Sequence, residues 1–272
     1  MTKDNKVVMF ADIMGFAALI ETYPLDIAGL RLQERILSPG NVYKLIEANQ
    51  NRLTDVFSSF HYSLRWILDM ARLKHPLTSI TFSDSSFVAT NYVYETVSIA
   101  IELLHSLLPQ KIPVRIGIAY GSFAALRFRS DITADSGDHA AHFLGQSVVR
   151  AHIAEACGIK GLRILLHPSV MPLLDDIQHN PQPKGREKYP LRVLECSEKE
   201  QVNKVGVTHE INYWQFAPTR EAQAWRGLQD MWDHAPPKVI EHYEATAQAI
   251  DRMRVATGCK PLRKLRRRTL PR

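Results

Sequence analysis

Hydrophobic and polar residues alternate along this chain with two periods, one typical of strands and the other of helices. The apolar run 6–13 predicts a buried strand that ends just after Asp12. Two alternating runs, 77–84 and 85–93, meet at Asp84 and predict a β-hairpin with this aspartate at its turn. Further strands are expected at 112–126, 162–168 and 189–196, and helices at 24–49, 53–73, 95–108, 145–158, 219–232 and 236–254.

The order of these elements predicts an α/β or α+β domain, because strands and helices alternate along the chain, and no internal repeats are present. A polar loop is expected at 129–140, and the helix over 24–49 is expected to break at 38–40. After about residue 197 the pattern changes to polar helices. We therefore expect a compact domain over 1–197, with the helix at 53–73 as an insertion, and a helical C-terminal extension over 198–272.

Composition and charge indicate the kind of protein and the cell compartment in which we expect it. The chain has 272 residues, of which 45% are hydrophobic, enough to bury a large core. Its net charge is +6, but 260–272 alone hold seven Lys and Arg, so the remainder is about −1 (6 − 7). This basic tail is either a solvated end or a binding segment for an anionic surface. Three widely spaced cysteines and no signal or membrane-spanning run indicate a cytoplasmic protein.

Two aspartates carry the candidate chemistry. Asp12 ends the first strand, and Asp84 lies at the hairpin turn 72 residues later. If the hairpin pairs beside the first strand, both carboxylates meet, and Mg²⁺ prefers such oxygens together with substrate phosphates. Gly15 then turns the chain into a helix whose first N–H groups can bind an anion. Aspartate is also an ordinary helix N-cap, but the pair favours a nucleoside triphosphate site.

Four motifs, "FADIMGF", "FSDSS", "VRIGIAYG" and "FLGQSVVRAHIAE", resemble the class III nucleotidyl cyclase domain in order and spacing over residues 5–196. The resemblance implies a ferredoxin-like catalytic domain, a head-to-tail homodimer with active sites at its interface, and two Mg²⁺ or Mn²⁺ ions. It implies metal binding by Asp12, Asp84 and the carbonyl of Ile13. The phosphate-binding residues that it implies are Met14, Gly15 and Phe16 through their backbone, and Lys184.

The chain departs from that family at the positions that read the base and stabilise the transition state. Ile80 replaces a base-reading lysine, and His142 replaces a second base-reading residue, so adenine recognition is not expected. Val149 and Ile153 stand where the family has an asparagine and an arginine, and neither can stabilise charge on a phosphate. Arg150 is expected to supply that charge as a catalytic residue, with Arg115 as another candidate.

The tripeptide Ser83-Asp84-Ser85 and these departures resemble the pyrimidine cyclases of bacterial Pycsar anti-phage systems. This resemblance implies conversion of UTP to cyclic UMP and pyrophosphate, with a separate cyclic-nucleotide-activated effector downstream. Three alternatives stay open: CTP as substrate with cyclic CMP as product, a catalytically silent nucleotide-binding module, and nucleic-acid binding through the tail, which is the least favoured.

Overall fold

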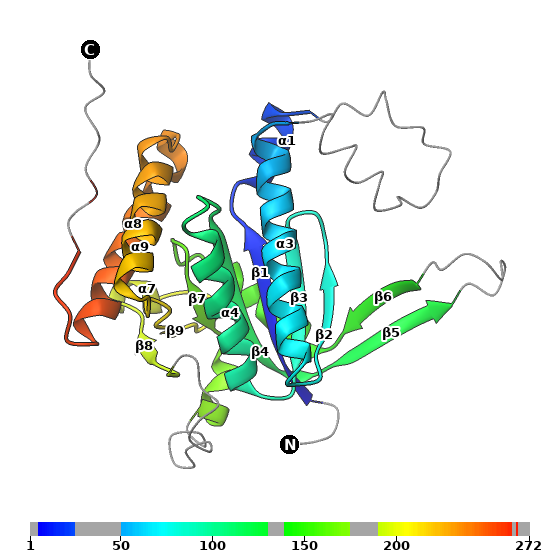
Figure 1. Ribbon diagram of the computed structural model, residues 1–272. Coiled ribbons are helices and arrows are strands. Elements are labelled where there is room, and N and C mark those ends of the chain that lie inside the picture. The colour runs from blue at the N-terminus through cyan, green and yellow to red at the C-terminus, as the bar shows by residue number, and fades with distance from the viewer. Residues whose placement is uncertain (1–4, 25–49, 130–138, 175–189, 263–264, 266–272) are drawn as a thin grey trace.

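The computed structural model describes residues 5–24, 50–129, 139–174, 190–262 and 265, so the predicted helix over 24–49 lies almost wholly outside them. Within this part of the chain, a seven-stranded mixed sheet and a separate two-stranded sheet are accompanied by helices (Figure 1). The order in the large sheet is β2 (Thr78–Thr81), β3 (Ser85–Thr90), β1 (Asn5–Ile13), β4 (Val114–Ser122), β7 (Ile164–Leu166), β9 (His209–Ile211) and β8 (Val193–Glu195).

The first four of these strands form the ferredoxin-like unit. Strand β1 pairs antiparallel with β3 on one side and with β4 on the other, and β2 pairs antiparallel with β3. Helices α1 (Phe16–Thr22) and α3 (Arg52–Arg72) connect β1 to β2, and α4 (Val93–Leu107) connects β3 to β4. The predicted α+β class, its ferredoxin-like core and the helices near 53–73 and 95–108 are therefore confirmed.

Both faces of β1 are covered, which explains why its sequence is apolar almost throughout. Val7, Met9 and Ile13 belong to the main core, together with the inner faces of α3 and α4, which lie side by side in Figure 1. Val8 and Phe10 point to the opposite face and pack beneath α5 (Gln146–Glu155). Asp12 shares that second face because side chains alternate along a strand.

Helix α5 lies against β4 at a point where only glycine fits. A Cβ atom on Gly117 would stand 2.1 Å from the carbonyl oxygen of Ala151 and 2.5 Å from the amide nitrogen of Glu155. We expect Gly117→Ala to lower the free energy of unfolding by about 2 kcal/mol, because the helix must move away from the strand. Urea denaturation measures this loss. An unchanged urea midpoint would show that α5 accommodates the added methyl group without a loss of stability.

The single strand predicted over 112–126 is wrong, because the chain leaves the sheet after Ser122. The Ser122 carbonyl accepts a hydrogen bond from Ser147 Oγ (3.0 Å). The Ser122 hydroxyl accepts a second one from the Gln146 amide (3.2 Å). These bonds commit the end of β4 to the start of α5. Among the described strands, β5 (Ala124–Arg129) then pairs with β6 (His139–Leu144) alone, and the two project from the body as a hairpin (Figure 1). The predicted loop over 129–140 thus includes the ends of both strands.

Residues beyond 197 complete the large sheet and its core. Strand β9, which the sequence did not predict, lies between β7 and β8. Helix α7 (Glu198–Gln201) precedes it, η1 (Pro168–Val170) follows β7, and the predicted polar helices are α8 (Pro218–Asp233) and α9 (Pro237–Val255). Leu228 and Ile250 from these helices are fully buried in the main core. The boundary predicted near residue 197 therefore runs through a continuous sheet.

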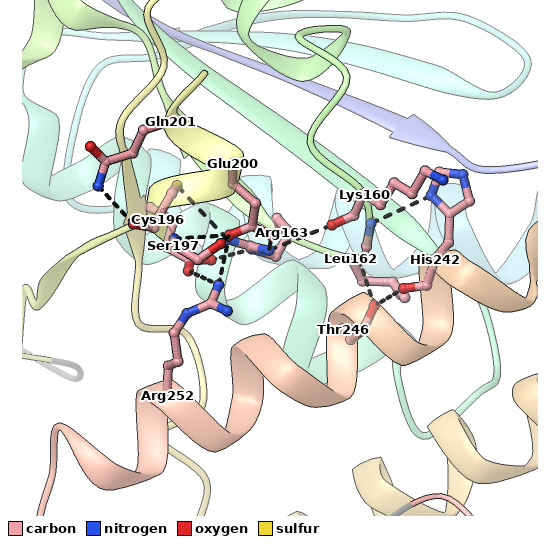
Figure 2. Close-up of polar contacts among 12 residues, drawn as sticks. Lys160, Leu162, Arg163, Cys196, Ser197, Glu200, Gln201, His242, Thr246 and Arg252 are labelled. Atoms are coloured by element: carbon pink, nitrogen blue, oxygen red, sulfur yellow. Dashed lines mark hydrogen bonds and ion pairs between the residues drawn. The ribbon is translucent and has the colours of Figure 1, made fainter. Parts of the chain in front are cut away.

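A buried ion network ties the last helix to this sheet (Figure 2). Arg163 has no exposed side-chain surface and pairs with Glu210, which is equally buried, and with Glu200 at 2.9 Å. Arg252 of α9 reaches Glu200 at 3.0 Å and Glu210 at 3.2 Å. Burial alone would raise the pKa of Glu200, but the hydrogen bonds and charge of Arg163 outweigh it and lower that pKa to about 2.

No helix in the described part of the chain is long and apolar enough to cross a membrane. Most of the basic tail, 263–264 and 266–272, lies outside the described residues. Leu262 and Leu265 within it pack against the main core.

Candidate functional site

The predicted meeting of Asp12 and Asp84 is what the strand register produces. Asp12 stands opposite Ser85 in the β1–β3 ladder, one residue from Asp84 in the β2–β3 turn. The Ile13 amide donates a hydrogen bond to the Asp84 carbonyl (2.9 Å). Two carboxylates that are 72 residues apart in the chain therefore lie at one end of the sheet.

Negative charge exceeds positive charge around Asp12. Its register partner on β4 is Arg115, which is already engaged by Glu155 of α5 at 2.5 Å. Burial, followed by the charges of Glu155 and Asp84, raises the pKa of Asp12 to about 7, against the opposing charge of Arg115. A cation at this end of the sheet would relieve that repulsion.

The residues present fit a divalent cation held jointly with a substrate. Asp12 and Asp84 are hard oxygen donors, and Mg²⁺ is commonly bound through one or two carboxylates plus substrate phosphates. In the part of the chain that the structure covers, no group of three or more His, Cys, Asp or Glu side chains is arranged to hold a metal ion. Backbone carbonyls, as predicted for Ile13, and oxygens of substrate and water are further ligands of the kind that Mg²⁺ accepts.

The turn after β1 begins α1 with Gly15 as its N-cap residue. Gly15 has φ of 79°, the left-handed conformation in which a side chain is strained, and Phe16 is buried as the anchor of the helix. The Met14 amide donates to the Pro113 carbonyl at 2.8 Å, so it is committed within the fold. The backbone predicted to bind phosphates is thereby narrowed to the amides of Gly15 and Phe16.

An aromatic row lies on the same face of the sheet as Asp12. Ile80 stands opposite Phe87, and Phe87 stands opposite Phe10 with ring centroids 4.5 Å apart. His152 of α5 meets Phe10 edge-on at 5.0 Å. Sequence reasoning found Ile80 but missed the two phenylalanines. The period-2 signal could have revealed Phe10, which lies two residues before Asp12.

Strand β6, which carries His142, lies beside β2, which carries Ile80, and the His142 side chain is exposed. The two positions predicted to line the base pocket thus come from neighbouring strands. Lys184, predicted to reach the triphosphate, lies outside the described residues.

Arg150 is not brought to the two aspartates of its own chain. Its Nη1 donates to the Tyr120 carbonyl at 3.1 Å, and Tyr120 pairs with Val7, five residues from Asp12 along β1. That spacing is roughly 17 Å at the usual rise of a strand. Among the described residues, Arg115 and not Arg150 is the arginine next to Asp12.

No protein-family model matches the chain, and neither does any curated protein. The similar solved structures include the guanylyl cyclase domain of the RhoGC fusion protein from the aquatic fungus Blastocladiella emersonii, with 14% identity over 76% of this chain and 94% of that chain and a TM-score of 0.44. A bacterial light-regulated adenylyl cyclase is 12% identical over 82% of this chain and 97% of that one, with a TM-score of 0.45.

An adenylate cyclase from Trypanosoma brucei is 14% identical over 80% of this chain and 91% of that chain, with a TM-score of 0.46. At such identities and scores the similarity says nothing about activity or substrate. The functional case therefore rests on the residues of the site.

Proposed function

We propose that this chain is a nucleotidyl cyclase of the class III type that converts UTP to cyclic UMP and pyrophosphate. The proposal rests on one observation: Asp12 and Asp84 meet beside the left-handed turn at Gly15, at a point where negative charge exceeds positive charge. Carboxylates paired in this way suit a divalent cation bound with a triphosphate, and backbone amides at a helix start suit the phosphates themselves.

In this reaction the 3′-hydroxyl of the ribose attacks the α-phosphate of the same nucleotide, and pyrophosphate leaves. Two Mg²⁺ or Mn²⁺ ions, when bound, favour the ionised hydroxyl and neutralise the phosphates. The residues of the chain itself position the cations and the phosphates. Asp12, Asp84 and the Ile13 carbonyl would hold the cations, the amides of Gly15 and Phe16 would bind the phosphates, and Lys184 would neutralise the departing pyrophosphate.

Base selection follows from what surrounds the predicted base pocket. Ile80 and the half-buried ring of Phe87, which packs on the buried ring of Phe10, form an apolar strip that offers no side-chain donor for a purine edge. His142 on the neighbouring strand supplies a polar group. A small pyrimidine that makes few hydrogen bonds suits this strip. CTP is the alternative substrate, since nothing in the strip separates the two pyrimidines.

A homodimer with active sites at the interface would explain the exposed apolar residues on and beside α5 and the position of Arg150. Val149 and Ile153 lie one turn apart on α5 and are 58% and 38% exposed, and Leu144 just before that helix is 63% exposed. Apolar side chains exposed together favour a partner surface. In such a dimer Arg150 would serve the partner's site. As the Pycsar resemblance implies, the product would activate a separate effector in anti-phage defence.

The test is incubation of the purified protein with ATP, GTP, CTP or UTP in Mn²⁺, with products identified by mass spectrometry. We expect a cyclic UMP peak that disappears in Asp84→Asn. A cyclic CMP peak would move the substrate to CTP, and a cyclic AMP or cyclic GMP peak would contradict the pyrimidine pocket.

A silent nucleotide-binding module is the second candidate. It is favoured by Val149 and Ile153, which cannot stabilise charge at the α-phosphate. It predicts that a folded dimer binds a nucleotide and yields no product from any of the four.

A further inference from the structure

Helix α3 contacts the turn that carries Asp84. His61, in the middle of this helix, has its Nε2 atom 3.1 Å from the carbonyl oxygen of Ser83, the residue just before Asp84. A carbonyl can only accept, so Nε2 carries the proton and donates it. The His61 ring is held in place by Phe57 and Phe60, whose ring centroids lie 4.3 and 5.3 Å from it.

This hydrogen bond acts on one of the two peptide groups that flank Asp84. The Ser83 carbonyl belongs to the peptide group before the Asp84 Cα atom, and His61 holds it from α3. The Asp84 carbonyl belongs to the peptide group after that atom, and the Ile13 amide holds it from β1 at 2.9 Å. With both peptide planes restrained, φ and ψ of Asp84 are restrained as well, and so is the direction of the Cα–Cβ bond that carries its carboxylate.

The hairpin turn does not need the hydrogen bond from His61 in order to close. The turn is closed by its own hydrogen bond from the Phe82 amide to the Ser85 carbonyl (2.8 Å). At the other end of β2, Arg72 of the same helix donates to Ser79 Oγ (2.9 Å), which ties the helix to the hairpin away from the aspartate. The His61 bond is thus the contact from α3 that bears on the orientation of Asp84.

We propose that His61 is a positioning residue for the proposed cyclase site: it orients the Asp84 carboxylate toward the shared cation through the Ser83 carbonyl. The inference rests on the proposed function, because it assumes that Asp84 binds a cation. Burial lowers the pKa of His61, partly offset by the bond to Ser83, so the ring is neutral and retains the Nε2 proton at neutral pH. His61 touches neither cation nor nucleotide.

The test compares four variants of the full chain by Mn²⁺ binding, measured by electron paramagnetic resonance, and by the KM and kcat for nucleotide. His61→Phe keeps a ring against Phe57 and Phe60 and removes the donor. His61→Gln places an amide N–H near the position of Nε2. Arg72→Met is the matched control, because it removes the other α3–hairpin hydrogen bond. Asp84→Asn reports the loss of the ligand itself.

We expect His61→Phe to weaken Mn²⁺ binding about 10-fold, the usual effect of losing a group that orients a metal ligand. His61→Gln should restore most of the affinity, and Arg72→Met should leave it unchanged. Thermal unfolding of each variant separates this effect from a general loss of structure. Equal Mn²⁺ affinity in His61→Phe and the unmodified protein would overturn the inference, and so would an equal loss in Arg72→Met.

The failure of the inference and that of the proposed function give different results. If the unmodified protein forms no product from any nucleotide, or if Asp84→Asn binds Mn²⁺ and forms product as well as the unmodified protein does, the proposed site is wrong and the role of His61 falls with it. If Asp84→Asn loses Mn²⁺ and product while His61→Phe retains both, the site stands and only the positioning role is refuted.

Discussion

Glu210→Ala is expected to lower the free energy of unfolding by about 3–5 kcal/mol. Its carboxylate is the buried partner of Arg163, and neither side chain has exposed surface. Among the described residues, removing this carboxylate leaves Glu200 as the charged partner of the Arg163 guanidinium, and Glu200 is itself shared with Arg252. A charge that cannot reach water and has lost half of its partners is costly, and it lies where α9 meets the sheet. Urea unfolding followed by circular dichroism measures the loss.

The matched control is Glu241→Ala. Glu241 of α9 pairs with Lys160, but the two side chains are 64% and 50% exposed. A surface pair contributes about 0–1 kcal/mol, so this variant should unfold almost as the unmodified protein does. If both variants lost the same small amount, the network around Arg163 would not be what fastens the C-terminal helix to the sheet.

Asp12→Asn is expected to act in opposite directions on activity and on stability. Activity should fall at least about 10³-fold, because the variant loses a charged ligand for the cations that stabilise the reacting phosphates. Without divalent cations, stability at pH 8 should rise by about 2 kcal/mol. Sites that assemble like charges for function commonly cost stability in this way.

The sign of the stability effect follows from the pKa of Asp12, which burial and two neighbouring carboxylates raise from 3.8 to about 7. A raised folded-state pKa means that the native protein binds more protons than the unfolded chain between those values. Native stability therefore falls as pH rises from about 4 to about 7, by at most about 4 kcal/mol, and partial solvation reduces this to about 2 kcal/mol.

Chemical denaturation in a chelating buffer at pH 4.5 and pH 8 measures this difference. Asp12→Asn should match the unmodified protein at pH 4.5 and exceed it at pH 8. Asp69→Asn is the control, because Asp69 is an exposed carboxylate paired with Arg72 on α3. A variant that was less stable than the unmodified protein at pH 8 would show that Asp12 is not under repulsion.

Local sequence patterns were sufficient to predict the strands and turns that carry Asp12, Gly15 and Asp84. The apolar run before Asp12, the glycine at 15 and the alternating runs around Asp84 each depend on neighbours within a few residues. Strand periodicity, turn geometry and helix initiation are decided at that range. For this reason β1, the hairpin and the start of α1 all match their predictions.

Non-local contacts decided the features that the sequence did not predict. Strand β9 has only three residues, too few for a periodic signal, and its place between β7 and β8 comes from pairing. The end of β4 at Ser122 depends on hydrogen bonds from the start of α5. Arg150 carries no mark in the sequence that directs it to the Tyr120 carbonyl, roughly 17 Å along the sheet from Asp12.

The sequence by itself determined which residue types are available for chemistry and where strands and turns present them: two aspartates and a glycine at the turn between strand and helix. Only the tertiary structure decided which of them meet. It set Arg115 and Glu155 beside Asp12, placed His61 against the turn of Asp84, and separated Arg150 from both aspartates. The reason is physical: a side chain's charge and a residue's backbone preference are local properties, whereas distance between segments follows from packing a whole core.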